Sequence, residues 1–241
     1  MNVKQAFILA GGKGERLRPL TDNIPKPLVK VKGKPILEYC IDNLLAYGVT
    51  EVIVASGHMH EKIEDYFESA EHHKRGMEIS FSVETEPLGT GGALKKAEEL
   101  LHNRFFMLNG DNIADFDLSA IEKAHNKNGC SATLALQKVN DVSSFGVAKI
   151  NGKKIIDFVE KPLPENAPSN LANAGCYLIE KKALDLLPKG FNLIEKTLFP
   201  ALAEKKELGW IEHKGYWFTT DTIERLKNAE TRLSSIEHQR R

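Results

Sequence analysis

The feature that most constrains this chain is an apolar run, residues 3–10, that breaks directly into a turn rich in glycine and basic residues. A continuous apolar run that ends at glycine is typical of a central parallel strand, buried on both faces. Gly11, Gly12 and Gly14 allow backbone N–H groups to point at an anion without a clash from Cβ atoms. Four cations surround the turn: Lys13, Arg16, Arg18 and Lys26. The pattern predicts a triphosphate cradle at the carboxyl end of the first strand of an α/β sheet; a plain turn with solvated cations is the alternative.

Two common phosphate-binding loops do not fit this turn. A P-loop needs a lysine followed by serine or threonine, but Lys13 lies between glycines and neither residue follows it. A dinucleotide-binding fingerprint needs a third small residue three positions after Gly14, where Leu17 stands. No acidic residue ends the second strand, at Ser56, so both loop types are disfavoured.

Composition confines any anion site to a local patch. The 241 residues include 33 basic and 33 acidic side chains, so no global field attracts nucleic acid or an anionic membrane. The N-terminus lacks an apolar signal core, and no apolar run approaches the ~20 residues of a membrane span. Cys40, Cys130 and Cys176 lack metal or disulfide spacing and are expected to be reduced core thiols. We expect a cytoplasmic protein that binds small molecules, with neither nucleic acid nor membrane as a partner.

Strand and helix patterns alternate along the first half of the chain, which predicts an α/β fold with a doubly wound, mostly parallel sheet. Shorter strands without crossovers follow, and Asn151-Gly152 indicates a hairpin between two of them. Residues 208–211 are expected to form an edge strand. The predicted strands are 3–10, 51–56, 78–83, 104–108, 132–136, 146–150, 155–158, 172–179 and 208–211; the predicted helices are 36–47, 60–67, 91–101, 118–128, 181–187, 194–205 and one from Thr222.

Motifs spread along nearly the whole chain resemble, in order, the signature of the sugar-1-phosphate nucleotidyltransferases, or NDP-sugar pyrophosphorylases. They are Leu-Ala-Gly-Gly-x-Gly-x-Arg-Leu-x-Pro-Leu-Thr from Leu9, Pro25-Lys26-Pro27, Glu-Pro-Leu-Gly-Thr-Gly-Gly from Glu86, Asn109-Gly110-Asp111, Phe145-Gly146, Glu160-Lys161-Pro162 and Asn173-Ala174-Gly175. The resemblance implies a Rossmann-like mixed sheet, the nucleotide-diphospho-sugar transferase fold, with a small antiparallel substrate-binding subregion. We expect one domain, residues 1–241, whose NTP-binding half is 1–115 and whose sugar-phosphate-binding half is 116–241.

The resemblance also implies the reaction, in which an oxygen of a sugar 1-phosphate attacks the α-phosphorus of an NTP and pyrophosphate leaves. Positioning and cationic stabilisation carry most of such catalysis. Three catalytic residues follow from the matching motifs: Arg16 at the transition state, Lys26 between the two phosphates, and Asp111 on Mg²⁺. Solvated cations, or a simple turn carboxylate, are the alternatives. The implied pathway is polysaccharide or lipopolysaccharide precursor synthesis, and a homo-oligomer is compatible with the resemblance.

The nucleotide-binding residues carried over from the family are Leu9, Ala10, Gly11, Gly12, Lys13, Gly14, Arg16, Lys26, Glu84, Pro87, Gly89, Thr90 and Asp111. Glu84 is a pure acceptor when ionised, and guanine offers two adjacent donors to it. The run around Glu84 and Glu86 also resembles that of mannose- and heptose-1-phosphate guanylyltransferases, which favours GTP. Uridylyltransferases carry similar runs, and the segment around Asp221 resembles that of cytidylyltransferases. Cytidylyl, uridylyl or thymidylyl transfer to glucose 1-phosphate or a related phosphate therefore remains open.

The sugar-phosphate residues implied in the same way are Asn109, Gly146, Glu160, Lys161, Asn173 and Gly175. Lys161 would hold the phosphate, while a carboxylate and a carboxamide suit pairs of ring hydroxyls. The polarity of a surface hairpin is the alternative explanation for these side chains.

The second metal ligand is where the sequence departs from the common family pattern. Many members end with Trp-x-Asp, but Thr219 stands two residues after Trp217 and Asp221 follows later, similar to the glucose-1-phosphate cytidylyltransferases. We predict Asp111 and Asp221 as the Mg²⁺ ligands, with helix capping as the alternative role of Asp221. Loss of a ligand at Thr219 would instead fit a regulatory nucleotide-sugar-binding protein. The histidines His58, His60, His72 and His73 lack metal-site spacing and are expected to face solvent.

Overall fold

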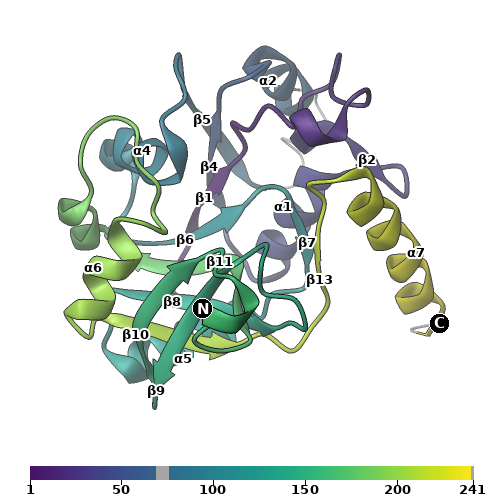
Figure 1. Ribbon diagram of the computed structural model, residues 1–241. Coiled ribbons are helices and arrows are strands. Elements are labelled where there is room, and N and C mark those ends of the chain that lie inside the picture. Colours follow the sequence, from purple (N-terminus) through teal and green to yellow (C-terminus); the bar gives the residue numbers. More distant parts are fainter. Residues whose placement is uncertain (69–75, 240–241) are drawn as a thin grey trace.

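The computed structural model describes residues 1–68 and 76–239, so the predictions for His72 and His73 lie outside it. A nine-stranded mixed sheet forms its centre, in the order β5-β4-β1-β6-β11-β8-β12-β10-β9 (Figure 1). The neighbouring strands β5, β4, β1 and β6 are all parallel, and β8 is parallel to β12. Strands β10 and β11 run opposite to the others. The prediction of an α/β fold with a mostly parallel mixed sheet is confirmed.

The strands of this sheet are β1 (Gln5–Leu9), β4 (Glu51–Ser56), β5 (Glu78–Val83), β6 (Arg104–Asn109), β8 (Ala132–Lys138), β9 (Gly146–Asn151), β10 (Lys154–Glu160), β11 (Leu171–Glu180) and β12 (Leu208–Glu212). Two short pairs lie outside it: β2 (Lys30–Val31) with β3 (Lys34–Pro35), and β7 (Asn112–Ala114) with β13 (Trp217–Thr219). The α-helices are α1 (Ile36–Ala46), α2 (His60–Glu68), α4 (Gly89–Lys96), α5 (Leu118–Asn128), α6 (Leu198–Glu204) and α7 (Ile223–Gln239). Short 3₁₀ turns are η1 (Glu15–Leu17), η2 (Lys26–Leu28), η3 (Glu98–Leu100), η4 (Pro164–Asn166) and η5 (Lys181–Leu186).

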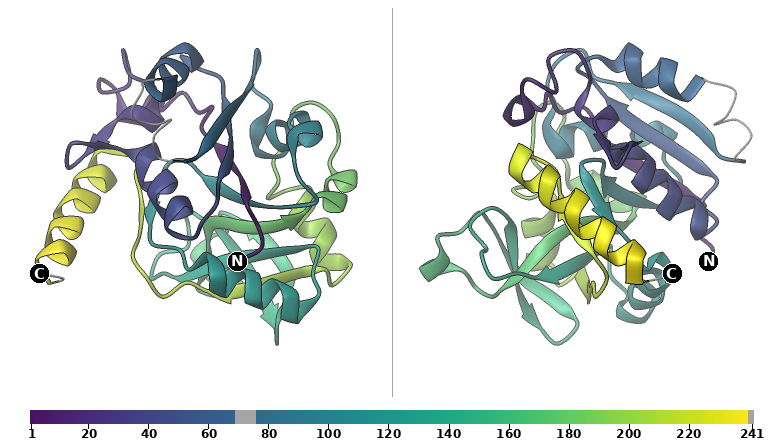
Figure 2. Two further views of the ribbon diagram at one scale, coloured as in Figure 1. Left: turned by 180° about the vertical axis from the view of Figure 1, so that it is seen from behind. Right: turned by 90° about the vertical axis from the view of Figure 1, so that its right-hand side faces the viewer.

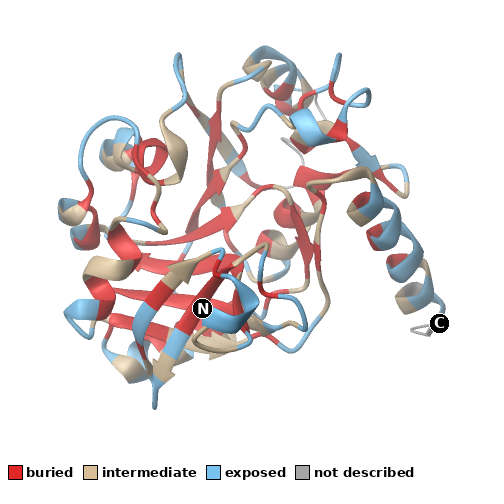
Figure 3. Cartoon of the chain, viewed as in Figure 1, coloured by how far each residue is buried: buried red, intermediate tan, exposed pale blue. Residues whose placement is uncertain are grey.

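Helices cover both faces of the sheet because its strands are apolar on both sides. Along β1, Phe7 packs into one core cluster with α4 and α6, while Ile8 packs into the other with α1, α2 and α5. Successive strand residues point to opposite faces of the sheet, so neighbouring residues of β1 pack against helices on different faces. The buried residues follow the central strands through the molecule (Figure 3). Because β1 is apolar on both faces, helices pack against both faces of the sheet, which gives the doubly wound arrangement.

Helix α7 brings the end of the chain back to its beginning. Its buried residues Leu226, Ala229 and Leu233 pack with Leu17 and with residues of β2 and α1 in a third apolar cluster. Figure 2 shows α7 lying along the N-terminal segments. Strand β13, just before α7, pairs antiparallel with β7, so the segment between β13 and α7 is held near the end of β6. This packing places residue 221 near the glycine loop.

Two sequence predictions about the second half are corrected. Strand β12 is not at an edge, because it lies between β8 and β10. Its partly exposed residues mimic an edge, since β10 pairs with it at a single position, Lys154 opposite Gly209. The predicted helix 194–205 begins only at Leu198, because residues 194–197 form turns in which the Lys196 and Thr197 N–H groups both donate to Leu193 O. The segment 181–187 is a 3₁₀ turn rather than an α-helix.

The three cysteines are free and buried, as predicted. Burial, together with the charge of Asp111, raises the pKa of Cys40 to about 12, so this thiol stays protonated. Among the described helices, none has the length and apolarity needed to span a membrane.

Candidate active site

A cavity of about 620 Å³ opens at the carboxyl ends of β1, β4 and β6. This volume lies in the range of small-molecule sites, and the carboxyl edge of a parallel sheet is the usual place for one. Most of the predicted nucleotide-binding residues line it: Leu9, Ala10, Gly11, Gly12, Lys13, Lys26, Glu84, Pro87, Gly89, Thr90 and Asp111, together with Asn109 from the predicted sugar-phosphate set. The cavity therefore brings together residues that are far apart in the chain, at the position where the sequence predicts triphosphate binding.

Gly12 and Gly14 of the first loop lie in different surroundings, and each has its own structural role. A Cβ at Gly12 would have no atom within 4 Å, so this backbone faces open space, as a phosphate-facing backbone should. Gly14 does not line the cavity; it has φ +65°, and a Cβ there would come within 3.0 Å of the Lys26 stem. Gly14 therefore makes room for Lys26 rather than contacting the cavity.

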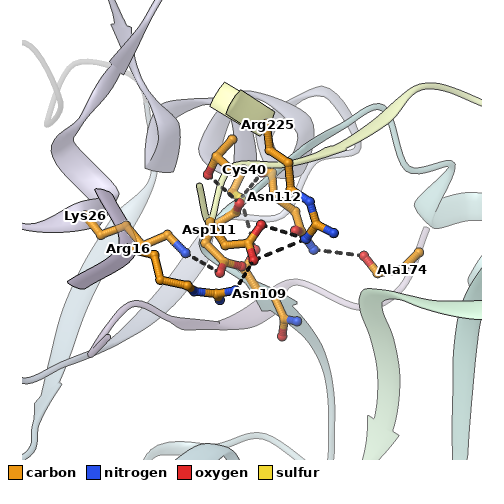
Figure 4. Close-up of polar contacts among 10 residues, drawn as sticks. Arg16, Lys26, Cys40, Asn109, Asp111, Asn112, Ala174 and Arg225 are labelled. Atoms are coloured by element: carbon orange, nitrogen blue, oxygen red, sulfur yellow. Dashed lines mark hydrogen bonds and ion pairs between the residues drawn. The ribbon is translucent and has the colours of Figure 1, made fainter. Parts of the chain in front are cut away.

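Lys26 and Asp111 form the central ion pair, with Lys26 Nζ 2.6 Å from Asp111 Oδ2. The Lys26 side chain is only 11% exposed, whereas that of Asp111 is 41% exposed and open to a ligand. Figure 4 shows Lys26 and Arg16 approaching from one side and Arg225 from the other. Just before Asp111, the chain lies close against β1: Gly110 donates its N–H to Leu9 O at 2.9 Å, and a Cβ at Gly110 would come 2.6 Å from that oxygen.

Asp221 lies in the same cluster, although it does not line the cavity. The preceding residue, Thr220, donates its hydroxyl to Asp111 O at 2.7 Å and so joins the two segments. Arg16 contacts the Asp221 carboxylate at 2.8 Å, and Arg225 donates to it at 2.9 Å. Burial raises the pKa of Asp221, but the hydrogen bond and charge of Arg225 and the charge of Arg16 outweigh it and lower the pKa overall. Asp221 is therefore a stable anion beside Asp111.

The donor chemistry of this carboxylate pair fits Mg²⁺. Magnesium takes oxygen ligands and is commonly held by one or two carboxylates, with waters and substrate phosphates completing its shell. Three or more His, Cys, Asp or Glu side chains gather as a metal cluster nowhere within residues 1–68 and 76–239. Asp111 and Asp221 would thus hold the ion together with the substrate rather than in a cage of their own.

Glu84 lines the cavity just after β5, beside Gly11. Its Oε2 accepts from the Leu88 N–H at 3.0 Å, which fixes the carboxyl group in place. Burial raises the pKa of Glu84, partly offset by the Leu88 hydrogen bond. A fixed acceptor with spare lone pairs suits a base that presents N–H donors.

The predicted sugar-phosphate residues other than Asn109 lie outside the cavity lining. Glu160 faces Gly146, where a Cβ would come 2.7 Å from Glu160 Oε2. Lys161 contacts Glu160 at 3.6 Å and has φ +50°, an unusual backbone angle that is common at functional sites. Asn173 Nδ2 donates to the Tyr177 hydroxyl at 2.8 Å.

Gly175 has φ +79°, and a Cβ there would come 2.7 Å from the Asn109 amide nitrogen. Its close approach is thus to Asn109 and Asn112. Within the described part of the chain, Asn109 Oδ1 is buried without a hydrogen-bond partner. A buried oxygen of this kind is costly unless a ligand supplies a donor.

A family model described as "Nucleotidyl transferase" matches residues 5–235, nearly the whole chain. The chain belongs to this nucleotidyltransferase family. A mannose-1-phosphate guanyltransferase from Yarrowia lipolytica is 40% identical over 218 residues, covering 88% of this chain and 59% of that protein. This chain therefore spans about three fifths of the length of that relative.

Solved structures agree with this assignment. A Bacillus anthracis protein assigned as a glucose-1-phosphate thymidylyltransferase, solved with sucrose, has a TM-score of 0.84 at 28% identity, covering 94% of each chain. HddC from Yersinia pseudotuberculosis, solved with GMP-PN, has a TM-score of 0.81 at 26% identity, covering 96% of this chain and all of that one. The nucleotidyltransferase resemblance seen in the motifs is confirmed at the level of the family.

Four cavity-lining residues that lie outside every recognised motif were missed from sequence: Gly57, His58, Phe191 and Leu193. His58 is exposed as predicted, but it follows β4 and lies at the rim of the cavity. Phe191 is the most exposed large apolar side chain described, at 68%.

Phe191 and Leu193 reach the cavity because their segment is anchored on α4, beside which it arches in Figure 1. Asn192 O accepts from the N–H groups of Gly91 and Gly92 at 3.0 and 3.3 Å. A Cβ on either glycine would collide with this segment. Glycine is unfavourable in a helix, so two glycines in the first turn of α4 were the sequence feature that could have predicted this close packing.

Proposed function

We propose that this chain transfers a nucleotidyl group from an NTP to a sugar 1-phosphate, forming an NDP-sugar and pyrophosphate, with Mg²⁺ as cofactor. The observation that carries the proposal is the shared cavity, in which the glycine loop, Lys26, Asp111 and Glu84 meet. Mannose-1-phosphate guanyltransferases at 40% identity support the reaction class. The cytoplasmic location, a homo-oligomer and the division into halves 1–115 and 116–241 stay predictions.

In the proposed reaction, a phosphate oxygen of the sugar substrate attacks the α-phosphorus of the NTP. The new P–O bond forms as the bond to the β-phosphate breaks, and pyrophosphate leaves with the electron pair. A phosphate monoester is largely ionised near neutral pH, so the attack requires no protein base. Lys26 neutralises charge on the α-phosphate from its buried position beside Asp111.

Arg16 has a different task. Its side chain is 70% exposed, and its guanidinium can leave Asp221 for the phosphoryl oxygens. When bound, Mg²⁺ supplies charge neutralisation at those oxygens, and Asp111 and Asp221 would hold it. Arg225 keeps Asp221 ionised and oriented after Arg16 has moved.

We infer GTP with mannose or heptose 1-phosphate as the preferred substrates. Glu84 suits the two donors of guanine, the relative from Yarrowia lipolytica is named for guanyl transfer, and the Yersinia structure holds GMP-PN. A second candidate, cytidylyl transfer, is favoured by Asp221-Thr222, which resembles the end of cytidylyltransferases. Thr219 in place of the common aspartate motivates a third candidate, a regulatory nucleotide-sugar-binding protein.

A substrate panel separates these functions. GTP, CTP, UTP and dTTP are each incubated with mannose, heptose or glucose 1-phosphate and Mg²⁺, and released pyrophosphate is measured. We expect turnover with GTP and mannose or heptose 1-phosphate, abolished by EDTA. Turnover with CTP alone would replace guanylyl by cytidylyl transfer. Nucleotide binding without any pyrophosphate release would contradict the enzyme and support the regulatory protein.

A further inference from the structure

Glu195 lies in the segment that follows Phe191 and is fixed by a residue of the cavity wall. The Thr90 hydroxyl donates to Glu195 Oε2 at 2.7 Å and accepts from the Ile194 N–H at 2.9 Å. Thr90 itself lines the cavity. Its hydroxyl therefore donates to one oxygen of this carboxylate while it accepts from the backbone of the residue that precedes Glu195.

The segment of Glu195 packs beside the predicted sugar-phosphate residues. Phe199, four positions after Glu195, contacts the rings of Phe158 and Tyr177 at centroid distances of 5.3 and 5.2 Å, and Phe158 precedes Glu160 by two positions on β10. Burial raises the pKa of Glu195, and the neighbouring charge of Glu160 raises it while that of Lys161 lowers it. The charges of Glu195 and Glu160 also both act on the buried Tyr177, whose hydroxyl accepts from Asn173. Glu195 thus shares one polar region with Glu160, Lys161 and Asn173, on the side of the cavity marked by Thr90.

Two half-buried carboxylates in one region are costly without donors to share. Vicinal hydroxyl groups of a sugar ring are such donors, and carboxylates with a few convergent polar groups are suited to orienting them. Glu195 accepts from the Thr90 hydroxyl and from its own backbone N–H, and Glu160 contacts Lys161, which leaves acceptor capacity on both carboxylates.

We propose that Glu195 binds a ring hydroxyl of the sugar 1-phosphate, opposite Glu160, and determines which sugars the site accepts; this rests on the function proposed above. Thr90 is a positioning residue that fixes the carboxylate. The remaining sugar hydroxyls are left to Glu160, Asn173 and the unpartnered Asn109 oxygen.

The test compares wild type with Glu195→Gln, using mannose 1-phosphate and its 2-, 3-, 4- and 6-deoxy analogues. A hydrogen bond to a charged group corresponds to about ten- to hundredfold, so we expect KM for mannose 1-phosphate to rise by that factor. KM for GTP should change less than about twofold. For the analogue that lacks the bound hydroxyl, wild type and variant should have similar kcat/KM.

Glu98→Gln is the matched control, because Glu98 is a half-buried glutamate that contacts Lys95 next to α4 and does not line the cavity. It should leave both KM values unchanged. Thr90→Val should shift KM for the sugar phosphate in the same direction as Glu195→Gln, and Thr90→Ser should restore it. Equal increases in both KM values, or a constant variant-to-wild-type ratio across all deoxy analogues, would overturn the proposal.

Failure of the proposed function is distinguishable from failure of this inference. If wild type releases no pyrophosphate with any substrate pair, the function fails. Calorimetric binding of mannose 1-phosphate to wild type and Glu195→Gln then decides the role of Glu195. Weaker binding to the variant supports it, whereas equal affinity, or no binding to either protein, overturns it.

Discussion

The two ends of strand β6 both carry charged side chains, but these are arranged in opposite ways. At the amino end, Arg104 Nε donates to Glu180 Oε1 at 2.7 Å, and β11 pairs these residues directly. His125 joins the same carboxylate oxygen at 3.0 Å through Nε2, and its Nδ1 is 2.9 Å from the Thr133 hydroxyl. Each of these polar side chains has a hydrogen-bond partner elsewhere in the fold.

At the carboxyl end, the groups are matched only in part. Asp111 contacts Lys26 but is 41% exposed, and Arg16 reaches Asp221 from an exposed loop position. Among the described side chains, Asn109 Oδ1 is buried without a hydrogen-bond donor. The comparison shows that polar groups at one end of the strand are paired within the fold, while those at the other end remain available to a ligand. Substitutions at the two ends should therefore separate activity from stability.

The largest effect should come from Arg16. Arg16→Ala removes a cation that acts on the phosphoryl group, so we expect kcat to fall by about 10²- to 10³-fold. Stability should change by no more than about 0.5 kcal/mol, since the side chain is 70% exposed. Arg18→Ala is a matched control, with a similarly exposed arginine in the same loop, and should retain activity. Pyrophosphate release and urea unfolding measure the two quantities, and equal kcat values for both variants would refute the role of Arg16.

The metal ligands should give the next largest effect. Asp111→Asn and Asp221→Asn should each raise the Mg²⁺ concentration for half-maximal activity at least about tenfold. Calorimetric titration of Mg²⁺ into enzyme with a non-hydrolysable GTP analogue gives a readout independent of turnover. Asp117→Asn is the control, because Asp117 caps α5 by accepting from the Ala120 N–H at 2.9 Å and should affect stability alone. Unchanged Mg²⁺ affinity in Asp221→Asn would leave Asp221 as a partner of Arg16 and Arg225 only.

At the amino end of β6, substitutions should lower the stability of the protein rather than its activity. Glu180→Ala removes the acceptor of the buried His125 Nε2 and of Arg104 Nε, which should cost about 1–3 kcal/mol of unfolding free energy with kcat unchanged. Glu212→Ala breaks the more exposed pair with Lys138 and should cost less than about 1 kcal/mol. Chemical denaturation compares the two variants. A loss of kcat in Glu180→Ala at full folding would mean that this end also serves the reaction.

The same contrast explains what the sequence could predict. Local patterns found the strands of the main sheet and most of the helices on its two faces, because each depends on neighbouring residues. Strand β12 was wrongly placed at an edge, since its position depends on a single contact with β10. The three-residue pairing of β7 with β13 was missed because strands so short have no periodic pattern.

The residues of the candidate site also fall into two groups: those that contiguous motifs predict, and those that only contacts between distant segments bring to the cavity. Contiguous motifs identified Lys26, Asp111 and Glu84, which the fold brings to one cavity. Phe191 and Leu193 were missed because they reach the cavity only through the anchoring of Asn192 on α4. Thr220 was also missed, although its hydroxyl joins Asp221 to Asp111, because that contact spans 109 positions of the chain. Contacts between distant segments leave little trace in the sequence of either segment.

The smallest effect should be a pH dependence that arises at the amino end. His125 is almost fully buried, and burial lowers its pKa below the ordinary value, more than the hydrogen bond to Glu180 raises it. Glu122 also favours the charged imidazole, whereas Arg104 opposes it. In the unfolded chain, the imidazole takes up a proton near pH 6.5, while the folded protein still holds it neutral.

The unfolding free energy should therefore fall as the pH drops below about 6.5, with a slope of at most about 1.4 kcal/mol per pH unit until the folded pKa is passed. His125→Gln should be less stable at pH 8 but should lack this component of the slope. Urea unfolding of both proteins between pH 8 and pH 5 measures the difference. Parallel stability curves would mean that His125 is protonated as readily in the folded protein as in the unfolded chain. The amino end of β6 would then be less closed to solvent than its hydrogen bonds indicate.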